Sequence, residues 1–293
     1  MRNNRVWFKR VYIEITNICN LSCPFCPGTQ RDPQLMTEET FTTILKQLKG
    51  STKHLCFHVM GEPLLHPLIG RFFDLACEKD FKVNLVTNGS LIHQVGQVIA
   101  HKKALRQISF SLHGLVHESI EVTDERLDSI FSFIAHVRRQ QNVYISLRLW
   151  NMTDRGEIDR NRHILDRIDQ EFHPPYNLKN ALLHDPTSGI PLGNGLFLNP
   201  AAEFDWPNLQ LNPIPGPAFC YGLRNQIGIL VDGTVIPCCL DSEGVINLGN
   251  ITETDLGQIL ASPRAQGIIE GFSQQKAVEP LCQRCPYRTR FTN

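Results

Sequence analysis

Three cysteines in one short stretch, Cys19-Asn-Leu-Ser-Cys23-Pro-Phe-Cys26, constrain this chain more than any other feature of its sequence. Their C-x3-C-x2-C spacing places three thiolates on one tight loop, whereas a [4Fe-4S] cluster contains four irons and usually takes four cysteine ligands. One iron would then stay open to a substrate or cofactor. The alternative is a structural zinc loop, but zinc favours C-x2-C pairs with a fourth ligand nearby, which this segment does not offer. The stretch therefore predicts an iron-sulfur cluster with an open iron.

This spacing, with the aromatic Phe25 directly before the last cysteine, resembles that of the radical S-adenosylmethionine (radical SAM) enzymes. The resemblance implies that Cys19, Cys23 and Cys26 hold the cluster, and that its open iron binds the amino and carboxylate groups of S-adenosylmethionine. In that family one electron cleaves the sulfonium, and the resulting 5'-deoxyadenosyl radical abstracts a hydrogen atom from the substrate.

The composition favours a soluble protein in a reducing compartment. At 293 residues and 42% hydrophobic, the chain can bury one large core and a small appendix. The 29 basic and 29 acidic side chains cancel, which disfavours nucleic acid or an anionic membrane as the main partner. No segment approaches roughly eighteen uninterrupted apolar residues, so we expect a cytoplasmic protein without a signal peptide or membrane span. Ten cysteines, eight of them in two ligand-like groups, suit metal chemistry better than disulfides.

Predicted strands and helices alternate through the first 184 residues. Alternating apolar and β-branched residues predict strands at 11–16, 53–59, 82–86, 107–112 and 143–150. Helices are predicted at 37–50, 68–79, 91–101 and 125–140. A helix around 160–172 and a sixth strand near 177–183 complete the pattern. Such repetition predicts parallel strands in an open doubly wound sheet or a barrel, and the family resemblance implies a partial (β/α)6 TIM-like barrel.

The rest of the sequence predicts a bridge and a second module. Residues 185–217 contain seven prolines and four glycines with little periodicity, so we expect a connection that can form one wall of a substrate pocket. The predicted division is thus a barrel at 1–184, a bridge at 185–217 and a C-terminal module at 218–293. In that module we expect a β-hairpin around the Asp232-Gly233 turn, then helices at 256–261 and 264–272.

A second set of cysteines lies in the C-terminal module, at Cys220, Cys238, Cys239, Cys282 and Cys285. A hairpin and two short helices bury little core, so a metal centre would supply the missing restraint. The spacing C-x17-C-x43-C-x2-C, with Gly233 before Cys238, resembles the SPASM/twitch auxiliary-cluster domain. The resemblance implies one auxiliary [4Fe-4S] cluster on Cys220, Cys238, Cys282 and Cys285. Cys239 is then a spare thiol that could exchange roles with Cys238, and a four-thiolate zinc site is the alternative.

Gly61-Glu62-Pro63 ends the second predicted strand. It resembles the family's GGEP motif, with Met60 in place of the first glycine, and the resemblance implies that Glu62 holds the methionine amino group. Gly61 would let the backbone approach the ligand, and Pro63 would fix the turn. An ordinary strand-to-helix turn is the alternative.

Four more polar residues at or after strand ends are candidates to bind the cofactor: Asn88, Ser111, Arg148 and Asn151. Short hydroxyl and amide groups there can hold ribose hydroxyls or the methionine carboxylate, and an ordinary turn is the alternative for Asn88 and for Ser111. His113 stands where many relatives have aspartate, which favours Ser111 as the contact. A charged residue inside a strand needs a partner, and for Arg148 this is either a ligand or a salt bridge to a helix. No general base stands out, since His58, His113, Glu203 and Asp205 are candidates by residue type alone.

Three hypotheses for the reaction follow. An auxiliary cluster with four protein ligands can only transfer electrons, which favours radical oxidation of a small polyol, aminocyclitol or sugar, as the twitch group's inosamine dehydrogenase does. The second hypothesis is modification of a peptide or protein, by thioether or carbon-carbon bond formation, by maturation of a Cys or Ser side chain, or by epimerisation with Cys239 as hydrogen donor. The third is a non-catalytic iron-sulfur or zinc scaffold. The family resemblance implies a flavodoxin- or ferredoxin-type reductant.

Overall fold

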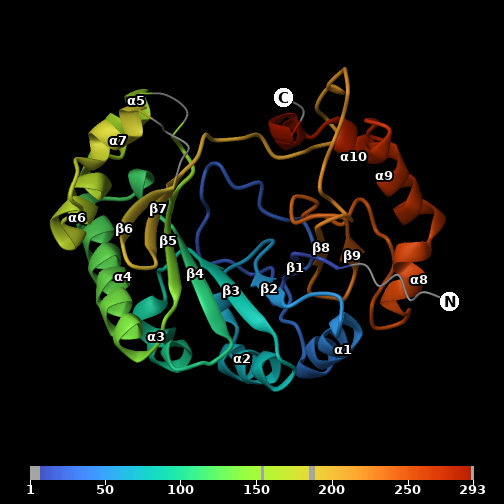
Figure 1. Ribbon diagram of the computed structural model, residues 1–293, viewed down its shortest axis with the longest axis horizontal. Coiled ribbons are helices and arrows are strands. Elements are labelled where there is room, and N and C mark those ends of the chain that lie inside the picture. The colour runs from blue at the N-terminus through green and yellow to red at the C-terminus, as the bar shows by residue number, and fades with distance from the viewer. Residues whose placement is uncertain (1–6, 153–154, 185–188, 292–293) are drawn as a thin grey trace. The chain divides into compact units, whose positions relative to one another are not determined.

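The computed structural model describes residues 7–152, 155–184 and 189–291 (Figure 1). These residues belong to two compact units. The first unit combines residues 7–83 with 204–291, so that it joins the N-terminal strands to the C-terminal module. The second unit is made of the described part of 84–203. None of the helices in the described ranges is long and apolar enough to cross a membrane.

In the first unit the described strands follow the order β2-β1-β8-β9. β1 (Arg10–Ile13) lies between β2 (His54–Phe57) and β8 (Gln226–Ile229) and runs parallel to both. β9 (Val235–Ile236) is antiparallel to β8, which confirms the hairpin predicted in this module. Because β8 pairs directly with β1, the hairpin extends the same sheet that leads into the three-cysteine stretch.

Amphipathic helices close the first unit. α1 (Glu38–Leu48) begins at the N-cap Thr37, whose side chain accepts from the backbone of Thr40, and α2 is Ile69–Glu78. The ring of Phe41 stacks on Phe72 with a centroid distance of 4.3 Å, and the rings of Phe41 and Phe73 both pack edge-on against Phe57 of β2. All four phenylalanines are fully buried. The C-terminal module adds α8 (Leu256–Ala261), α9 (Pro263–Ser273) and α10 (Pro280–Gln283), and the short 3-10 helices of the unit are η1 (Pro63–Leu65) and η3 (Pro286–Phe291).

The second unit continues from β3 (Lys82–Thr87) in the strand order β3-β4-β5-β7-β6. β4 (Leu105–Ser111), β5 (Tyr144–Leu149) and β7 (Leu196–Pro200) are parallel, and β6 (Ile190–Gly193) is an antiparallel edge strand. Figure 1 shows α3 (Ile92–Ala100) and α4 (Ile120–Gln140) side by side along this group of strands. The remaining helices are η2 (Leu115–His117), α5 (Arg155–Arg160), α6 (Arg162–Phe172) and α7 (Leu178–His184).

The parallel sheet is not closed, as expected for a partial barrel, and the α/β class predicted from the sequence is confirmed. The predicted strand near 177–183 is wrong, because these residues form α7, with the buried Leu178 and Leu182 four residues apart on one helical face. The next parallel strand is β7, inside the proline-rich bridge where the sequence showed no period. The proposed boundaries after residues 184 and 217 stay predictions, and 185–188 lie outside the described residues.

Candidate functional site

The cysteine loop, residues 18–33, follows β1 and is closed at its base by side-chain hydrogen bonds. The Thr16 hydroxyl donates to the Gln34 carbonyl at 2.9 Å. The Asn17 amide nitrogen donates to the Asp32 carbonyl at 2.8 Å, and its oxygen accepts from the Gln34 backbone at 2.7 Å. These bonds hold the entry and exit of the loop together, so the three cysteines are presented from a fixed base.

The three thiols of this loop belong to residues 19, 23 and 26. The Cys26 backbone donates to the Cys23 carbonyl at 3.0 Å, and Cys19 and Cys26 are exposed. None of the ten cysteines forms a disulfide. Across the described ranges, no three His, Cys, Asp or Glu side chains gather closely enough for one metal ion. In a [4Fe-4S] cluster each thiolate binds its own iron, and three accessible thiols on one loop fit such a cluster with one open iron.

Gly61 packs directly on the start of the cysteine loop. Its φ is +73°, and a Cβ there would lie 2.4 Å from the Thr16 carbonyl oxygen and 2.8 Å from that of Ile18. The Glu62 backbone donates to the Ile18 carbonyl at 2.8 Å. Glycine is therefore needed at this position, because any side chain would push the cysteine loop away. The close approach that the structure shows at Gly61 is to the backbone of the cysteine loop, and the approach to a ligand stays a prediction.

The side chain of Glu62 is buried at 1% exposure and caps η1, accepting from the Leu64 backbone at 3.0 Å. Pro63 occupies the first position of that short helix. This is the geometry of a strand-to-helix turn, the alternative considered for the motif. The cap fixes the carboxylate in place two residues after Met60, and contact with a ligand ammonium stays a prediction.

A buried ion pair that the sequence analysis missed connects the cysteine loop to two other segments. The carboxylate of Glu14 is fully buried and lies 2.6 and 2.8 Å from the two terminal nitrogens of Arg31. It also accepts from the backbones of Met60 at 3.3 Å and Val231 at 3.1 Å. The Arg31 Nε donates to the Ser242 carbonyl at 2.9 Å. One carboxylate thus ties together β1, the loop before Gly61, the cysteine loop and the C-terminal hairpin.

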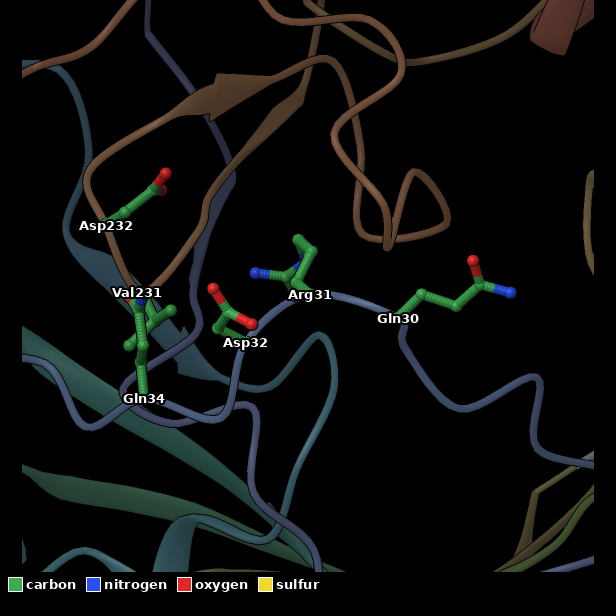
Figure 2. Close-up of a pocket in the computed structure, with 6 residues that line it drawn as sticks. All are labelled: Gln30, Arg31, Asp32, Gln34, Val231 and Asp232. Carbon is green, nitrogen blue, oxygen red and sulfur yellow. The ribbon is translucent and has the colours of Figure 1, made fainter.

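Arg31 also borders a polar pocket of about 340 Å³ (Figure 2). Figure 2 shows its lining residues, which come from the end of the cysteine loop and the residue after it and from the β8–β9 turn: Gln30, Arg31, Asp32, Gln34, Val231 and Asp232. None of the residues predicted from the sequence to bind the cofactor lines it. The pocket belongs to the junction between the cysteine loop and the C-terminal hairpin.

Four C-terminal cysteines lie within electrostatic reach of one another. Burial raises the pKa of Cys220, Cys238, Cys282 and Cys285, and neighbouring thiolates raise it further for Cys238, Cys282 and Cys285. The thiolates that act on Cys238 are those of Cys239, then Cys220 and Cys282, and those that act on Cys282 are Cys220 and Cys285. Half-buried thiolates that repel one another are stabilised when a metal centre neutralises them, so this donor set fits an iron-sulfur cluster.

A buried arginine that the sequence analysis missed lies beside these thiols. Arg288, in η3, is 3% exposed. Its Nε donates to the Cys282 carbonyl at 3.1 Å, and its terminal nitrogens donate to the carbonyls of Ile214 at 2.6 Å and Pro217 at 3.4 Å. Its position in a C-x2-C-x2-R pattern is the signal by which the sequence could have revealed it.

Cys239, the spare thiol of the sequence analysis, is half-buried. It packs with Tyr12 and Trp206 against a small apolar cluster formed by Val59, Met60, Leu230 and Ile236. Burial, and then the charge of Cys239, raises the pKa of Tyr12 well above its ordinary value. Cys239 therefore follows the proposed cluster ligand Cys238 in the sequence and lies close to the side chain of Tyr12 in β1.

In the second unit, two predicted cofactor residues are neighbours across a strand pair. Ser111, the last residue of β4, stands opposite Arg148, the last residue but one of β5. The guanidinium of Arg148 lies 3.4 Å from the ring centroid of Trp150. His113 Nδ1 is 3.5 Å from the Arg148 carbonyl, and burial, followed by the charge of Arg148, lowers the pKa of His113 to about 4. His113 is thus a neutral imidazole at neutral pH.

The two predicted asparagines differ in how their amide groups are used. The Asn88 oxygen accepts from both the backbone and the hydroxyl of Ser90, at 2.8 and 2.6 Å, and so stabilises its own turn. The Asn151 nitrogen donates to Asn161 at 3.3 Å, and the Asn151 oxygen is buried without a hydrogen-bond partner among the described residues. A buried acceptor of this kind is a candidate ligand contact.

Two family models match the chain. Residues 13–145 match the radical SAM superfamily, and residues 220–286 match SPASM, an iron-sulfur cluster-binding domain. No curated protein matches the chain closely in sequence.

Several solved structures share this fold. BtrN in complex with AdoMet and 2-DOIA is 18% identical, with a TM-score of 0.55, over 95% of this chain and 93% of that one. Streptococcus suis SuiB bound to the precursor peptide SuiA is 16% identical, with a TM-score of 0.61, over 98% and 73%. The protein anSMEcpe with AdoMet and the Kp18Cys peptide is 14% identical, with a TM-score of 0.52, over 94% and 88%. At these identities the likeness shows the fold alone.

Proposed function

The chain belongs to the radical SAM superfamily and carries a C-terminal SPASM domain, and we propose that it oxidises a small polyol, aminocyclitol or sugar. The family implies a [4Fe-4S] cluster with S-adenosylmethionine and auxiliary iron-sulfur chemistry. When bound, these groups supply a 5'-deoxyadenosyl radical and an acceptor for one electron. Removal of a hydrogen atom from a carbinol carbon, followed by loss of an electron from the carbon radical and of the proton from its hydroxyl group, would give a ketone, a two-electron oxidation.

In this proposal Cys19, Cys23 and Cys26 hold the radical SAM cluster, and Cys220, Cys238, Cys282 and Cys285 hold the auxiliary cluster. The Gly61-Glu62-Pro63 turn keeps the cysteine loop in position through the Ile18 and Thr16 contacts and offers Glu62 to the methionine ammonium. Asn88, Ser111, Arg148 and Asn151 are assigned to S-adenosylmethionine or substrate. The assignment of Asn151 is supported by its buried amide oxygen, which could accept a hydrogen bond from a polar ligand.

One observation supports the proposal: the thiolates of Cys220 and Cys282 act on the pKa of Cys238, and those of Cys220 and Cys285 act on the pKa of Cys282, so these four half-buried cysteines are candidates for one set of ligands. One set of four ligands suits one auxiliary cluster with no open iron, which can accept an electron but cannot bind substrate.

The test is anaerobic turnover with a panel of polyols, aminocyclitols and sugars. The reduced, iron-reconstituted protein should form 5'-deoxyadenosine and a product two mass units lighter, in equal amounts. A substrate deuterated at the reacting carbon should transfer its deuterium to 5'-deoxyadenosine. Cleavage of S-adenosylmethionine without oxidation of any panel member, alongside modification of a peptide, would overturn the small-molecule assignment.

The position of Cys239 favours a second candidate function, the epimerisation of a residue in a peptide or protein substrate. A half-buried thiol beside a cluster ligand and against Tyr12 can return a hydrogen atom to a carbon radical. The product would then have the mass of the substrate, and in deuterated water it would gain one deuterium from the exchanged thiol.

Replacing Cys239 with serine separates the two functions. An oxidase should keep its product, whereas an epimerase should lose product and continue to form 5'-deoxyadenosine. Cys77→Ser is the matched control, since Cys77 is also half-buried and lies in α2, away from both cysteine sets in the sequence.

The proposal is completed by a flavodoxin- or ferredoxin-type reductant and a cytoplasmic location. Ten cysteines without a disulfide suit a reducing compartment. Support of 5'-deoxyadenosine formation by purified flavodoxin with its reductase, in place of dithionite, tests the reductant.

A further inference from the structure

The positive charge of Arg288 is buried without a carboxylate to neutralise it. The side chain is 3% exposed, and its side-chain hydrogen bonds go to three backbone carbonyls, those of Ile214, Pro217 and Cys282. Within the described ranges it forms no ion pair with Asp or Glu. A buried guanidinium in such a place needs an anionic neighbour, because carbonyl dipoles alone do not replace its hydration.

The neighbouring anionic groups are the four thiolates of the C-terminal module. Arg288 lies three residues after Cys285, its backbone nitrogen donates to the Cys285 carbonyl at 3.3 Å, and its Nε bonds to the Cys282 carbonyl. The backbone of Arg288 is thus bonded to that of Cys285, and its guanidinium is held at the backbone carbonyl of Cys282. A four-thiolate iron-sulfur centre is negatively charged, and one-electron reduction makes it more so.

We propose that Arg288 tunes the auxiliary cluster: its fixed positive charge favours the reduced state and so raises the cluster's reduction potential. The net charge around a cluster is one of the main determinants of that potential. The couple takes up one electron and no proton, so the charge of Arg288 opposes the added negative charge directly. The proposal rests on the ligand assignment of Cys220, Cys238, Cys282 and Cys285, which iron counting tests by itself.

The experiment compares Arg288→Gln with Arg288→Lys in a full-length background in which Cys19, Cys23 and Cys26 are replaced by alanine. Only the auxiliary cluster then contributes to the spectra. Both substitutions disturb the same hydrogen bonds, but lysine keeps the charge. The midpoint potential is measured by electron paramagnetic resonance during a dithionite titration, with iron counted in every sample.

The glutamine variant should lower the equilibrium constant for reduction by at least about tenfold, which is about 59 mV more negative for one electron. The lysine variant should stay close to the background protein. Arg224→Gln is the control for loss of one positive charge in the same module, because Arg224 bonds to the backbone of Ile269 and to Ser273 in α9. The Arg224→Gln variant should leave the midpoint potential of the auxiliary cluster unchanged.

Equal potentials in the glutamine and lysine variants would overturn the proposal. So would loss of iron from both, since the hydrogen bonds of Arg288 and not its charge would then matter. Assembly in the lysine variant but not in the glutamine variant counts in favour of the charge. A background protein that holds no iron would instead remove the ligand assignment, and the tuning role with it.

Discussion

Each of the two cysteine regions has an arginine beside it, half-buried at Arg31 and buried at Arg288, and the two charges are compensated in different ways. Arg31, at the end of the cysteine loop, is neutralised by the bidentate carboxylate of Glu14. Arg288, beside the C-terminal thiols, donates its side-chain hydrogen bonds to carbonyls. The ion pair of Arg31 with Glu14 stabilises the local structure. The positive charge of Arg288 has no carboxylate bonded to it and can act on the thiolates.

This difference teaches that burial of a cation has two distinct uses. A neutralised pair fixes geometry and contributes little field at a distance. An isolated charge projects its field, and at an effective dielectric constant near 20 a unit charge 4 Å away is worth about 4 kcal/mol. The proposed radical SAM cluster needs an accurately held loop, whereas the proposed auxiliary cluster needs a suitable potential, and the two environments match these needs.

The largest expected effect separates the two regions by activity. Cys23→Ala should abolish formation of 5'-deoxyadenosine, by at least about a thousandfold, because the three-thiolate site can no longer hold its cluster. Cys282→Ala should keep that cleavage and lose the oxidised product. Chromatographic quantification of both compounds under anaerobic conditions gives the result. Cleavage that survives in Cys23→Ala would place the radical chemistry elsewhere and would support a scaffold role for the loop.

Removal of the carboxylate at Glu14 should destabilise the protein by about 2 kcal/mol, because it leaves the half-buried charge of Arg31 without its partner. The free energy of unfolding of Glu14→Gln is measured by urea denaturation monitored by circular dichroism. The double variant Glu14→Gln with Arg31→Met should recover most of the loss, as both charges are then gone. Equal stability of the single and double variants would show that Glu14 and Arg31 are not energetically coupled. Arg31 would then not differ from Arg288 in having a carboxylate that stabilises it.

Gly61→Ala should damage the first region and spare the second. A Cβ 2.4 Å from the Thr16 carbonyl, at a φ of +73°, should displace the cysteine loop and cost about 2 kcal/mol. The reconstituted variant should retain roughly four irons, those of the auxiliary cluster, where the wild type holds roughly eight. Gly267→Ala is the control, because a Cβ at that position meets nothing within 4 Å. Iron and sulfide are measured per chain in both variants. A wild-type iron content in Gly61→Ala would contradict the role proposed for the contact between Gly61 and the cysteine loop.

The smallest effect concerns a third buried arginine, Arg148, which acts on His113. Burial, and then the Arg148 charge, lowers the pKa of His113 to about 4, from an ordinary value of 6.5. Between these values the unfolded chain binds the proton and the folded protein does not. Stability is therefore complete above pH 6.5 and falls as the pH drops towards 4. His113→Asn should lessen the decrease between pH 7 and pH 5 by about 1 kcal/mol, as measured by urea denaturation at both pH values. An unchanged pH dependence would show that His113 is not shielded from protonation.

The sequence predicted the alternating elements of the barrel well, because amphipathic periods are local. Ser119, the N-cap of α4, was overlooked, so the predicted helix began five residues after Ile120. The segment that became α7 was assigned as a strand, although the spacing of Leu178 and Leu182 is helical. The edge hairpin of β6 and β7 was missed because glycine and proline conceal the strand pattern there.

The sequence by itself determined the donor chemistry of this protein, since the spacing of cysteines along a loop decides which thiolates can share a cluster. The tertiary structure alone decided the electrostatics around those thiolates. The partners that matter are far apart in the chain: Arg31 meets Ser242 across 211 residues, and Arg288 meets Ile214 across 74. Whether a buried charge is neutralised depends on which distant group folds against it, and no local pattern encodes that.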